Sequence, residues 1–136
     1  MRESASTQQQ LLEYKAILDH SGIAVVCTRH RHVYRCNQRA EELFGWPAGT
    51  LVGQPALVFY PSSEACDALR RQARSQLGSG QVVNLETQLT RRDGSTFIAQ
   101  LIARAIDPAE PGQATVWIVR DITQEVYLSG NVPSPF

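Results

Sequence analysis

The stretch that decides the fold is Gln113-Ala-Thr-Val-Trp-Ile-Val-Arg-Asp-Ile-Thr123. Its middle is rich in β-branched and aromatic residues, which favour a pleated strand. Because successive side chains of a strand point to opposite faces, both faces carry mainly apolar groups: Thr115, Trp117 and Val119 on one, and Val116, Ile118 and Ile122 on the other. Such a strand is typically central in its sheet and covered on both faces. The run ends at Arg120-Asp-Ile-Thr123, so we expect it to deliver a polar motif to the exit of the domain.

The composition is that of one ordinary globular domain. The chain has 136 residues, 43% of them hydrophobic, and its 13 basic and 13 acidic residues give a formal net charge of zero. A neutral domain is poorly suited to grip nucleic acid or an anionic membrane, and we predict neither partner. No apolar run reaches the length of about 20 residues that spans a bilayer, and residues 1–10 do not resemble a signal peptide. The odd set of cysteines, Cys27, Cys36 and Cys66, is typical of a reduced protein, so we expect a cytoplasmic domain.

The two ends of the chain differ from its middle. Residues 1–7 are polar and predicted to be disordered, and residues 126–136 are predicted to be a linker or truncated connector. Residues 8–20 are predicted to form a flanking amphipathic helix with one broad apolar stripe: Leu11, Leu12, Tyr14, Ile17 and Leu18. The stripe is too wide to face water, so we expect this helix to cover the domain, a second copy of the chain, or both.

Between these ends, short periodic segments alternate with turn residues. Strands are predicted at 23–28, 32–36, 82–91, 95–106 and 113–123, and helices at 38–44 and 64–77, with one-turn helices between 48 and 61. Asn37 is a helix cap and Gly45 a helix stop, while Asp93-Gly94 is the signal of a two-residue hairpin. Helices that cluster between two groups of strands indicate an α+β fold with an antiparallel sheet and helices on one face.

Four segments, taken in order, resemble the PAS domain, the sensory module of signalling proteins. They are Asn37-Gln-Arg-Ala-Glu-Glu-Leu-Phe-Gly-Trp46, Leu51-Val-Gly-Gln54, Glu86-Thr-Gln-Leu-Thr-Arg-Arg-Asp-Gly-Ser95 and Arg120-Asp-Ile-Thr123. The resemblance implies a PAS domain over residues 21–125. It also implies a five-stranded antiparallel sheet of order 2-1-5-4-3, with short helices on one face and an N-terminal flanking helix or a second subunit on the other.

The resemblance also implies a small cavity between the helices and one face of the sheet. Parity in the first hairpin predicts that Val25, Cys27, Tyr34 and Cys36 point toward the helices. The full candidate lining is Val25, Cys27, Tyr34, Cys36, Phe44, Leu57, Phe59, Leu69, Leu85, Leu89, Phe97 and Leu101. This set is apolar enough for a small hydrophobic ligand, and equally suits a filled core.

The sequence disfavours the cofactors known in the family and leaves the cofactor open. Flavin-binding relatives carry a cysteine after the Gly-Lys/Gln turn, whereas residues 54–60 contain none. Haem relatives use a histidine on the long helix, but no histidine follows His32. Cys66 is interpreted as a packed thiol. The spacing of Cys27, His30, His32 and Cys36 fits no standard zinc site, and we predict no metal.

Motifs of catalysis are missing from the sequence: it has no Walker-type phosphate loop and no nucleophile elbow, so we predict no catalytic residue and no enzyme. The candidate output site is Arg120, Asp121 and Thr123, whose side chains can bind backbone where a strand ends. Arg91 and Arg92 could pair with acidic groups nearby.

Two functions remain open. The first is a sensory or dimerisation module that relays a signal to a downstream effector, such as the histidine kinase of a two-component system, a diguanylate cyclase or a transcription regulator. The second is a homodimerisation domain with a filled core and no ligand.

Overall fold

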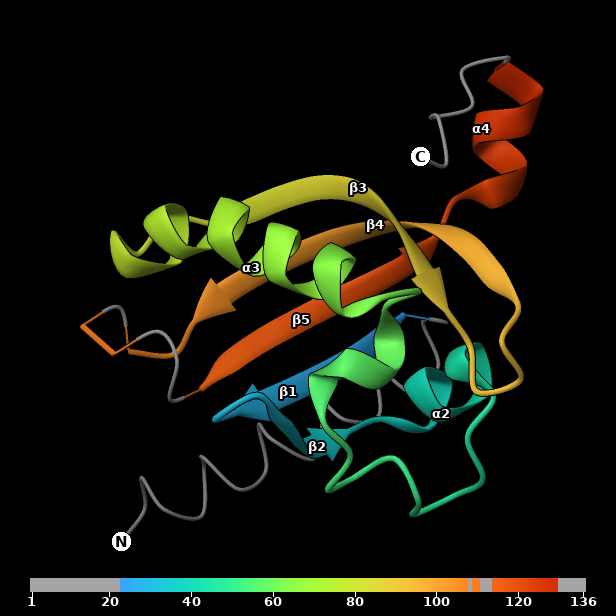
Figure 1. The fold of residues 1–136 in the computed structure, drawn as a ribbon, viewed down its shortest axis with the longest axis horizontal. Coiled ribbons are helices and arrows are strands. Elements are labelled where there is room, and N and C mark those ends of the chain that lie inside the picture. Colours follow the sequence, from blue (N-terminus) through green and yellow to red (C-terminus); the bar gives the residue numbers. More distant parts are fainter. Residues whose placement is uncertain (1–22, 108, 111–113, 130–136) are drawn as a thin grey trace, which may run out of the picture.

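A computed structural model describes residues 23–107, 109–110 and 114–129. Its elements, in order, are β1 (Ala24–Arg29), β2 (His32–Cys36), α2 (Gln38–Phe44), the 3-10 helix η1 (Ala56–Phe59), α3 (Ser63–Gly78), β3 (Val83–Thr90), β4 (Thr96–Ala105), β5 (Thr115–Asp121) and α4 (Thr123–Ser129) (Figure 1). The predicted disordered segment 1–7 and flanking helix 8–20 lie outside the described residues.

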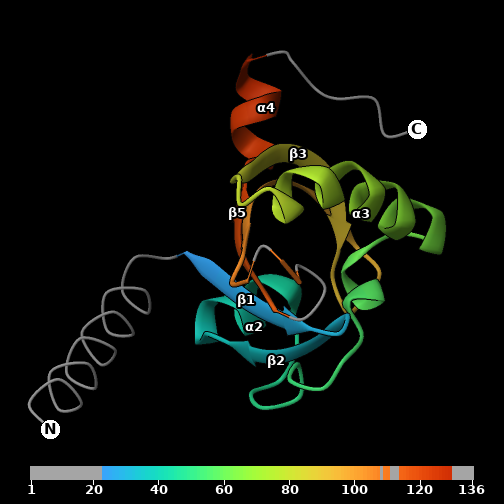
Figure 2. The same cartoon turned by 90° about the vertical axis from the view of Figure 1, so that its left-hand side faces the viewer.

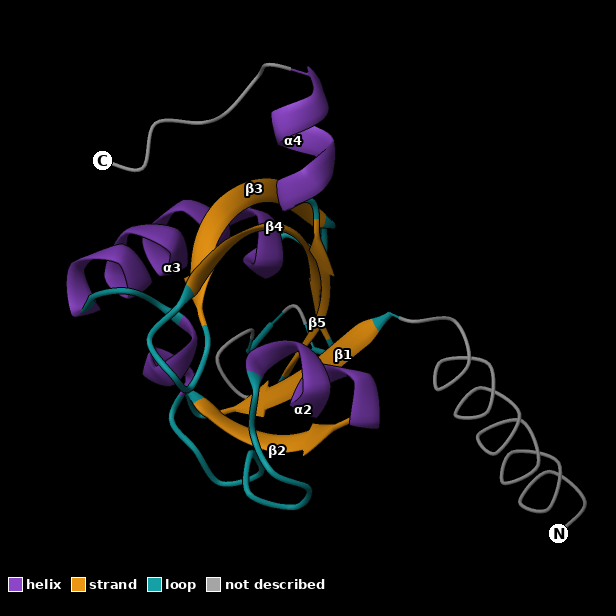
Figure 3. Cartoon of the chain, turned by 90° about the vertical axis from the view of Figure 1, so that its right-hand side faces the viewer, coloured by secondary structure: helices purple, strands orange, loops and turns teal. Residues whose placement is uncertain are grey.

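The strands form one antiparallel sheet in the order β2-β1-β5-β4-β3, as predicted. The decisive stretch is its central strand, because β5 pairs with β1 on one side and with β4 on the other. Helix α3 lies against β3 and β4, and α2 lies against β1. The sheet is strongly curved, and α4 leaves it at the end where β5 stops (Figures 2 and 3).

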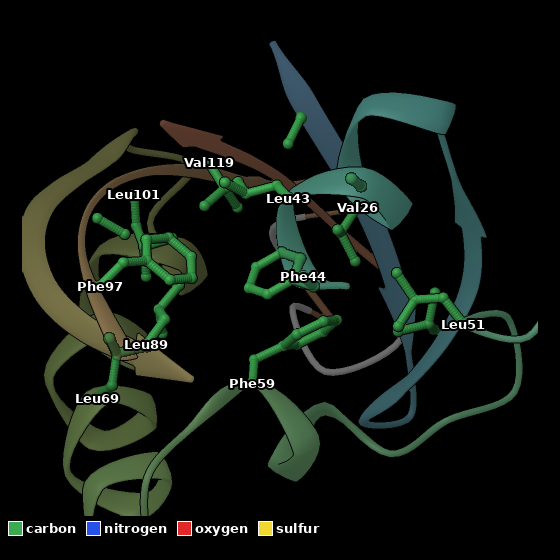
Figure 4. Packing of buried hydrophobic residues seen from close by; sticks show 14 residues of the cluster. Val26, Leu43, Phe44, Leu51, Phe59, Leu69, Leu89, Phe97, Leu101 and Val119 are labelled. Atoms are coloured by element: carbon green, nitrogen blue, oxygen red, sulfur yellow. The ribbon is translucent and has the colours of Figure 1, made fainter. Parts of the chain in front are cut away.

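The hydrophobic core lies between the helices and the concave face of the sheet (Figure 4). Its main cluster of buried side chains is Ala24, Val26, Val33, Ala40, Leu43, Phe44, Leu51, Phe59, Leu69, Leu89, Phe97, Ala99, Leu101 and Val119. A second cluster packs α3 against the beginning of β3 and the end of β4 through Ala73, Leu77, Val83, Ala103 and Ala105. Trp117 of β5 packs against both clusters, so the central strand joins the two parts of the core.

The predicted facing of β1 is wrong. Ala24 and Val26 are the core residues, only 1% and 2% exposed, and therefore Val25 and Cys27 point to the opposite face of the sheet. Both faces of this strand carry apolar side chains, so alternation alone could not select the buried one.

The predicted facing of Tyr34 is also wrong, because a bulge interrupts the first hairpin. Cys27 pairs with Arg35 but Thr28 pairs with Val33, so Tyr34 is the extra residue of the bulge. Val33 is buried in the core, whereas the Tyr34 ring lies 4.4 Å beneath the guanidinium of Arg29 and outside the core clusters.

Two connections differ from the sequence prediction. Strand β3 ends at Thr90 and β4 begins at Thr96, so residues 91–95 form a longer loop than the predicted two-residue turn. Asp93 shapes this loop by accepting hydrogen bonds from the backbone N–H and the hydroxyl of Ser95. Residues 126–129, predicted as part of a connector, continue helix α4, and Val126 is buried at 7% exposure.

Candidate functional site

The candidate pocket lining converges on an aromatic cluster. Six of the predicted residues are buried in the main core cluster, and two more, Cys36 and Leu85, pack against it; the six are Phe44, Phe59, Leu69, Leu89, Phe97 and Leu101. The Phe44 ring lies 4.4 Å from that of Phe59 and 5.6 Å from that of Phe97, between ring centroids. Figure 4 shows these rings occupying the space where α2, η1 and β4 face one another.

One residue of that lining is misplaced by the sequence prediction. Leu57 is 46% exposed and lies on the solvent side of η1. Phe59, two residues later in the same short helix, enters the core instead, at 7% exposure. A segment of four residues is too short for its apolar periodicity to identify the buried side.

The three cysteines are partly buried thiols without disulfides. Burial raises the pKa of Cys36 to about 11, with a smaller contribution from Glu41, and burial also raises the pKa of Cys27 and of Cys66. Protonated thiols are poor nucleophiles and poor metal ligands. Within the described residues, no group of three or more histidine, cysteine, aspartate or glutamate side chains could hold a metal ion.

The predicted output residues meet at the junction between β5 and α4. The Oδ1 atom of Asp121 accepts a hydrogen bond of 2.9 Å from the N–H of Thr123, which begins α4. The hydroxyl of Thr123 accepts one of 2.9 Å from the N–H of Ile98, and the carbonyl of Ile98 accepts one of 2.8 Å from the N–H of Ile122. Strand β4 therefore holds the chain in place for two residues after β5 has ended.

Arg91 connects this junction to the core. One nitrogen of its guanidinium, Nη2, lies 3.4 Å from Oδ2 of Asp121, and Nε donates to the carbonyl of Leu43 at 3.2 Å. Its charged plane lies 4.6 Å from the centre of the Phe97 ring. The sequence had indicated an acidic partner for Arg91, but gave no signal for the carbonyl of Leu43.

Arg120 joins the other face of the sheet to α4. Its Nη1 donates to Glu125 in the first turn of α4 at 2.8 Å, and its Nε and Nη2 donate to Oε1 of Gln100 at 3.3 and 3.1 Å. Gln100 in turn donates to Asn84 of β3 at 3.2 Å. The ion pair between Arg120 and Glu125 is exposed to solvent, so it contributes little to stability.

The convex face of the sheet carries an apolar row. Val25, Ile118 and Ile102 are register neighbours on β1, β5 and β4, and all three are partly exposed. Cys27 and Val116 extend the row by one pair. This surface would be the one available to the predicted cover helix or to a second copy of the chain.

Comparison with known proteins identifies the family. The family model for the PAS domain matches residues 20–124, and the fold of the described residues has the strand order that the resemblance implied. The chain belongs to the PAS domain family, whose members are sensory modules.

Individual relatives agree with this assignment. The sensor protein TdiS of Thauera aromatica is 27% identical over 111 residues, which are 82% of this chain but only 20% of that protein, so the chain spans about a fifth of its relative's length. The PAS domain, in complex with ethanol, of a LuxR-family transcriptional regulator from Burkholderia thailandensis is 25% identical with a TM-score of 0.74, covering 80% of this chain and 96% of that one. A PAS domain from Colwellia psychrerythraea shares the fold, with a TM-score of 0.73 and 20% identity over 84% of this chain and 98% of its own.

None of the helices that the structure describes is both long and apolar enough to cross a bilayer.

Proposed function

We propose that this PAS domain senses a change at its aromatic core and relays it through the β5–α4 junction to a downstream effector. The observation that carries the proposal is the junction itself, where Asp121 and Thr123 bind the backbone at the point at which the sheet becomes a helix. A helix fixed in this way to β4 and β5 has to follow them when they shift.

The effector belongs to a signalling protein. TdiS is a sensor protein, and the Burkholderia relative is a domain of a transcriptional regulator. The candidate effectors are a histidine kinase, a diguanylate cyclase and a transcription regulator, each connected to the domain through α4. The domain performs no catalysis in this proposal.

The signal is a small hydrophobic molecule that enters the core. The core lining is apolar, and the Burkholderia domain is in complex with ethanol, a two-carbon alcohol. In this chain the ring of Phe44 contacts the rings of both Phe59 and Phe97, so a ligand that enters between them has to displace at least one ring. Because side chains in a packed core interlock, such a displacement is transmitted to neighbouring elements.

The test combines native mass spectrometry with NMR. Protein purified from cells is examined for a retained molecule, and is then titrated with ethanol and with 1-hexanol while the amide signals are followed. We expect saturable shifts at the core amides of Phe59 and Leu89 and, with the same midpoint, at the amides of Ile98 and Thr123. Absence of both a retained molecule and a saturable response would contradict the sensory role.

The apolar row on the convex face favours a second function, homodimerisation. A sheet face with partly exposed Val25, Ile118 and Ile102 is typical of a covered surface. A second copy, together with the apolar stripe Leu11, Leu12, Tyr14, Ile17 and Leu18, is the proposed cover.

Analytical ultracentrifugation of the full chain tests this surface. We expect Ile118→Lys to weaken self-association, while Val82→Lys, a change at an exposed apolar residue just before β3, leaves it unaltered. A wild-type chain that is monomeric at every concentration tested would exclude the dimer. If deletion of residues 1–20 left the melting temperature unchanged, the covering role of the N-terminal segment would be wrong.

A further inference from the structure

The loop between β3 and β4 holds the end of α2. The last two carbonyls of that helix, at Leu43 and Phe44, cannot find partners within the helix. Both find them in the loop: Leu43 accepts from Nε of Arg91 at 3.2 Å, and Phe44 accepts from the backbone N–H of Arg92 at 2.9 Å. The end of α2 is therefore bound by two consecutive residues of the loop, through the side chain of Arg91 and the backbone of Arg92.

The same end of α2 carries the centre of the aromatic cluster. Phe44 is the last residue of the helix, is 1% exposed, and contacts the rings of Phe59 and Phe97. The guanidinium of Arg91 lies over one of these two rings, 4.6 Å from the centre of Phe97. A displacement of the Phe44 ring thus moves both the carbonyl and the ring that Arg91 contacts.

On its far side Arg91 meets the carboxylate that starts α4. Asp121 uses one oxygen for each neighbour: Oδ2 faces Arg91 at 3.4 Å, and Oδ1 accepts from the N–H of Thr123 at 2.9 Å. A planar guanidinium has five N–H donors in fixed directions, so a shift at Leu43 has to be shared by the contact with Asp121. The side chain of Arg91 is 29% exposed, which limits the screening of this pair by water.

From these contacts we propose that Arg91 is a positioning residue that couples the aromatic core to the β5–α4 junction. The inference rests on the proposed sensory function and names the route that the signal takes. Displacement of Phe44 moves α2, the carbonyl of Leu43 draws Arg91 with it, and Asp121 then reorients the first turn of α4.

A double-mutant cycle read by NMR tests this route in the full chain. Phe59→Leu perturbs the core, and the readout is the change in chemical shift and exchange rate of the Thr123 amide, which donates to Asp121. The change is measured in the wild-type, Arg91→Gln and Arg92→Gln backgrounds. Arg92 is the matched control, because its guanidinium lies over the ring of Trp46 and has no ion pair with Asp121.

We expect the response of Thr123 to Phe59→Leu to fall by about twofold or more in Arg91→Gln and to persist in Arg92→Gln, as energetic coupling between contacting residues predicts. Arg91→Lys should lose the response too, since a single ammonium lacks the fork that holds Leu43 and Asp121 together. The Arg91→Lys variant also provides the test of the route if Arg91→Gln fails to fold.

Two other results would overturn the inference, in distinguishable ways. An equal response of Thr123 in the wild-type, Arg91→Gln and Arg91→Lys backgrounds would exclude the Arg91 route and leave the coupling between core and junction intact. A Thr123 amide that does not respond to Phe59→Leu in the wild-type chain would contradict both the route and the proposed function.

Discussion

The hydroxyl of Thr123 accepts a hydrogen bond from the backbone N–H of Ile98, with 2.9 Å between the two heavy atoms. A side chain at the start of α4 here takes the place of a strand residue, because β5 has already ended at Asp121. The pairing along β4 is thus continued by the side chain of Thr123 at the point where α4 begins.

Replacing Thr123 by valine removes the acceptor and keeps the shape. The N–H of Ile98 is partly buried, so we expect the free energy of unfolding to fall by about 1–2 kcal/mol. Thr123→Ser retains the hydroxyl and should lose much less. Urea denaturation measures the difference, and coincident midpoints for the valine and serine variants would show that the hydroxyl is not needed.

Asn37 links the start of α2 to β1 and to the residue that precedes it. Its Oδ1 accepts from the N–H of Ala40, which caps α2, and from the N–H of Val25, both at 3.0 Å, while Nδ2 donates to the carbonyl of Ile23 at 2.8 Å. Loss of the cap alone costs about 1 kcal/mol, and the two bonds to β1 and its approach add to it.

We therefore expect Asn37→Ala to lower the free energy of unfolding by about 2–3 kcal/mol. Asn37→Asp preserves both accepted bonds and loses only the donated one, so its loss should be about half as large. The comparison is made by urea denaturation at neutral pH. If aspartate proved as damaging as alanine, the bond to Ile23 would outweigh the cap.

Features set by local sequence were predictable. Helix α2 has the predicted bounds because Asn37 and Gly45 are local signals, and Gly45 adopts the left-handed φ of 75° that a helix stop requires. The central place of β5 followed from its two apolar faces, and the sheet order followed from the resemblance.

Features set by distant contacts were not predictable. The bulge at Tyr34 depends on how two strands pair, which no pattern within either strand encodes. Arg91 donates to the backbone carbonyl of Leu43, which lies 48 residues earlier in the chain. Because every residue has a backbone carbonyl, the sequence carries no signal for this contact. This is why the sequence could point to Asp121 and Thr123 at the end of β5 but not to the contact of Arg91 with Leu43.

The aromatic cluster can be tested on one short helix. Phe59 is 7% exposed and in contact with Phe44, whereas Leu57 is 46% exposed on the same helix η1. We expect Phe59→Ala to destabilise the domain by about 3–5 kcal/mol, because truncation leaves a cavity in a packed core. Leu57→Ala should change stability by about 0.5 kcal/mol or less. Thermal and urea unfolding of both variants check this contrast, and similar losses would mean that Leu57 is also a core residue.

Cys36 gives a prediction about pH. Its thiol is ordinarily half ionised at pH 9.0, and in the fold burial, helped by the nearby Glu41, raises its pKa to about 11. The folded state therefore holds this proton more tightly than the unfolded chain. The resulting stability is fully present below pH 9.0 and is lost as the pH rises toward 11.

Alkylation measures this shift, since only the thiolate reacts. In a chain with Cys27→Ser and Cys66→Ser, the rate of modification of Cys36 by iodoacetamide should still be rising with pH well above 9.0. In urea, where the chain is unfolded, the midpoint of the rate profile should lie near pH 9.0. The midpoint of the rate profile, unlike the rate itself, is independent of how much the fold shields the sulfur. A folded midpoint equal to the unfolded one would therefore show that the thiol of Cys36 is as well solvated in the domain as in water.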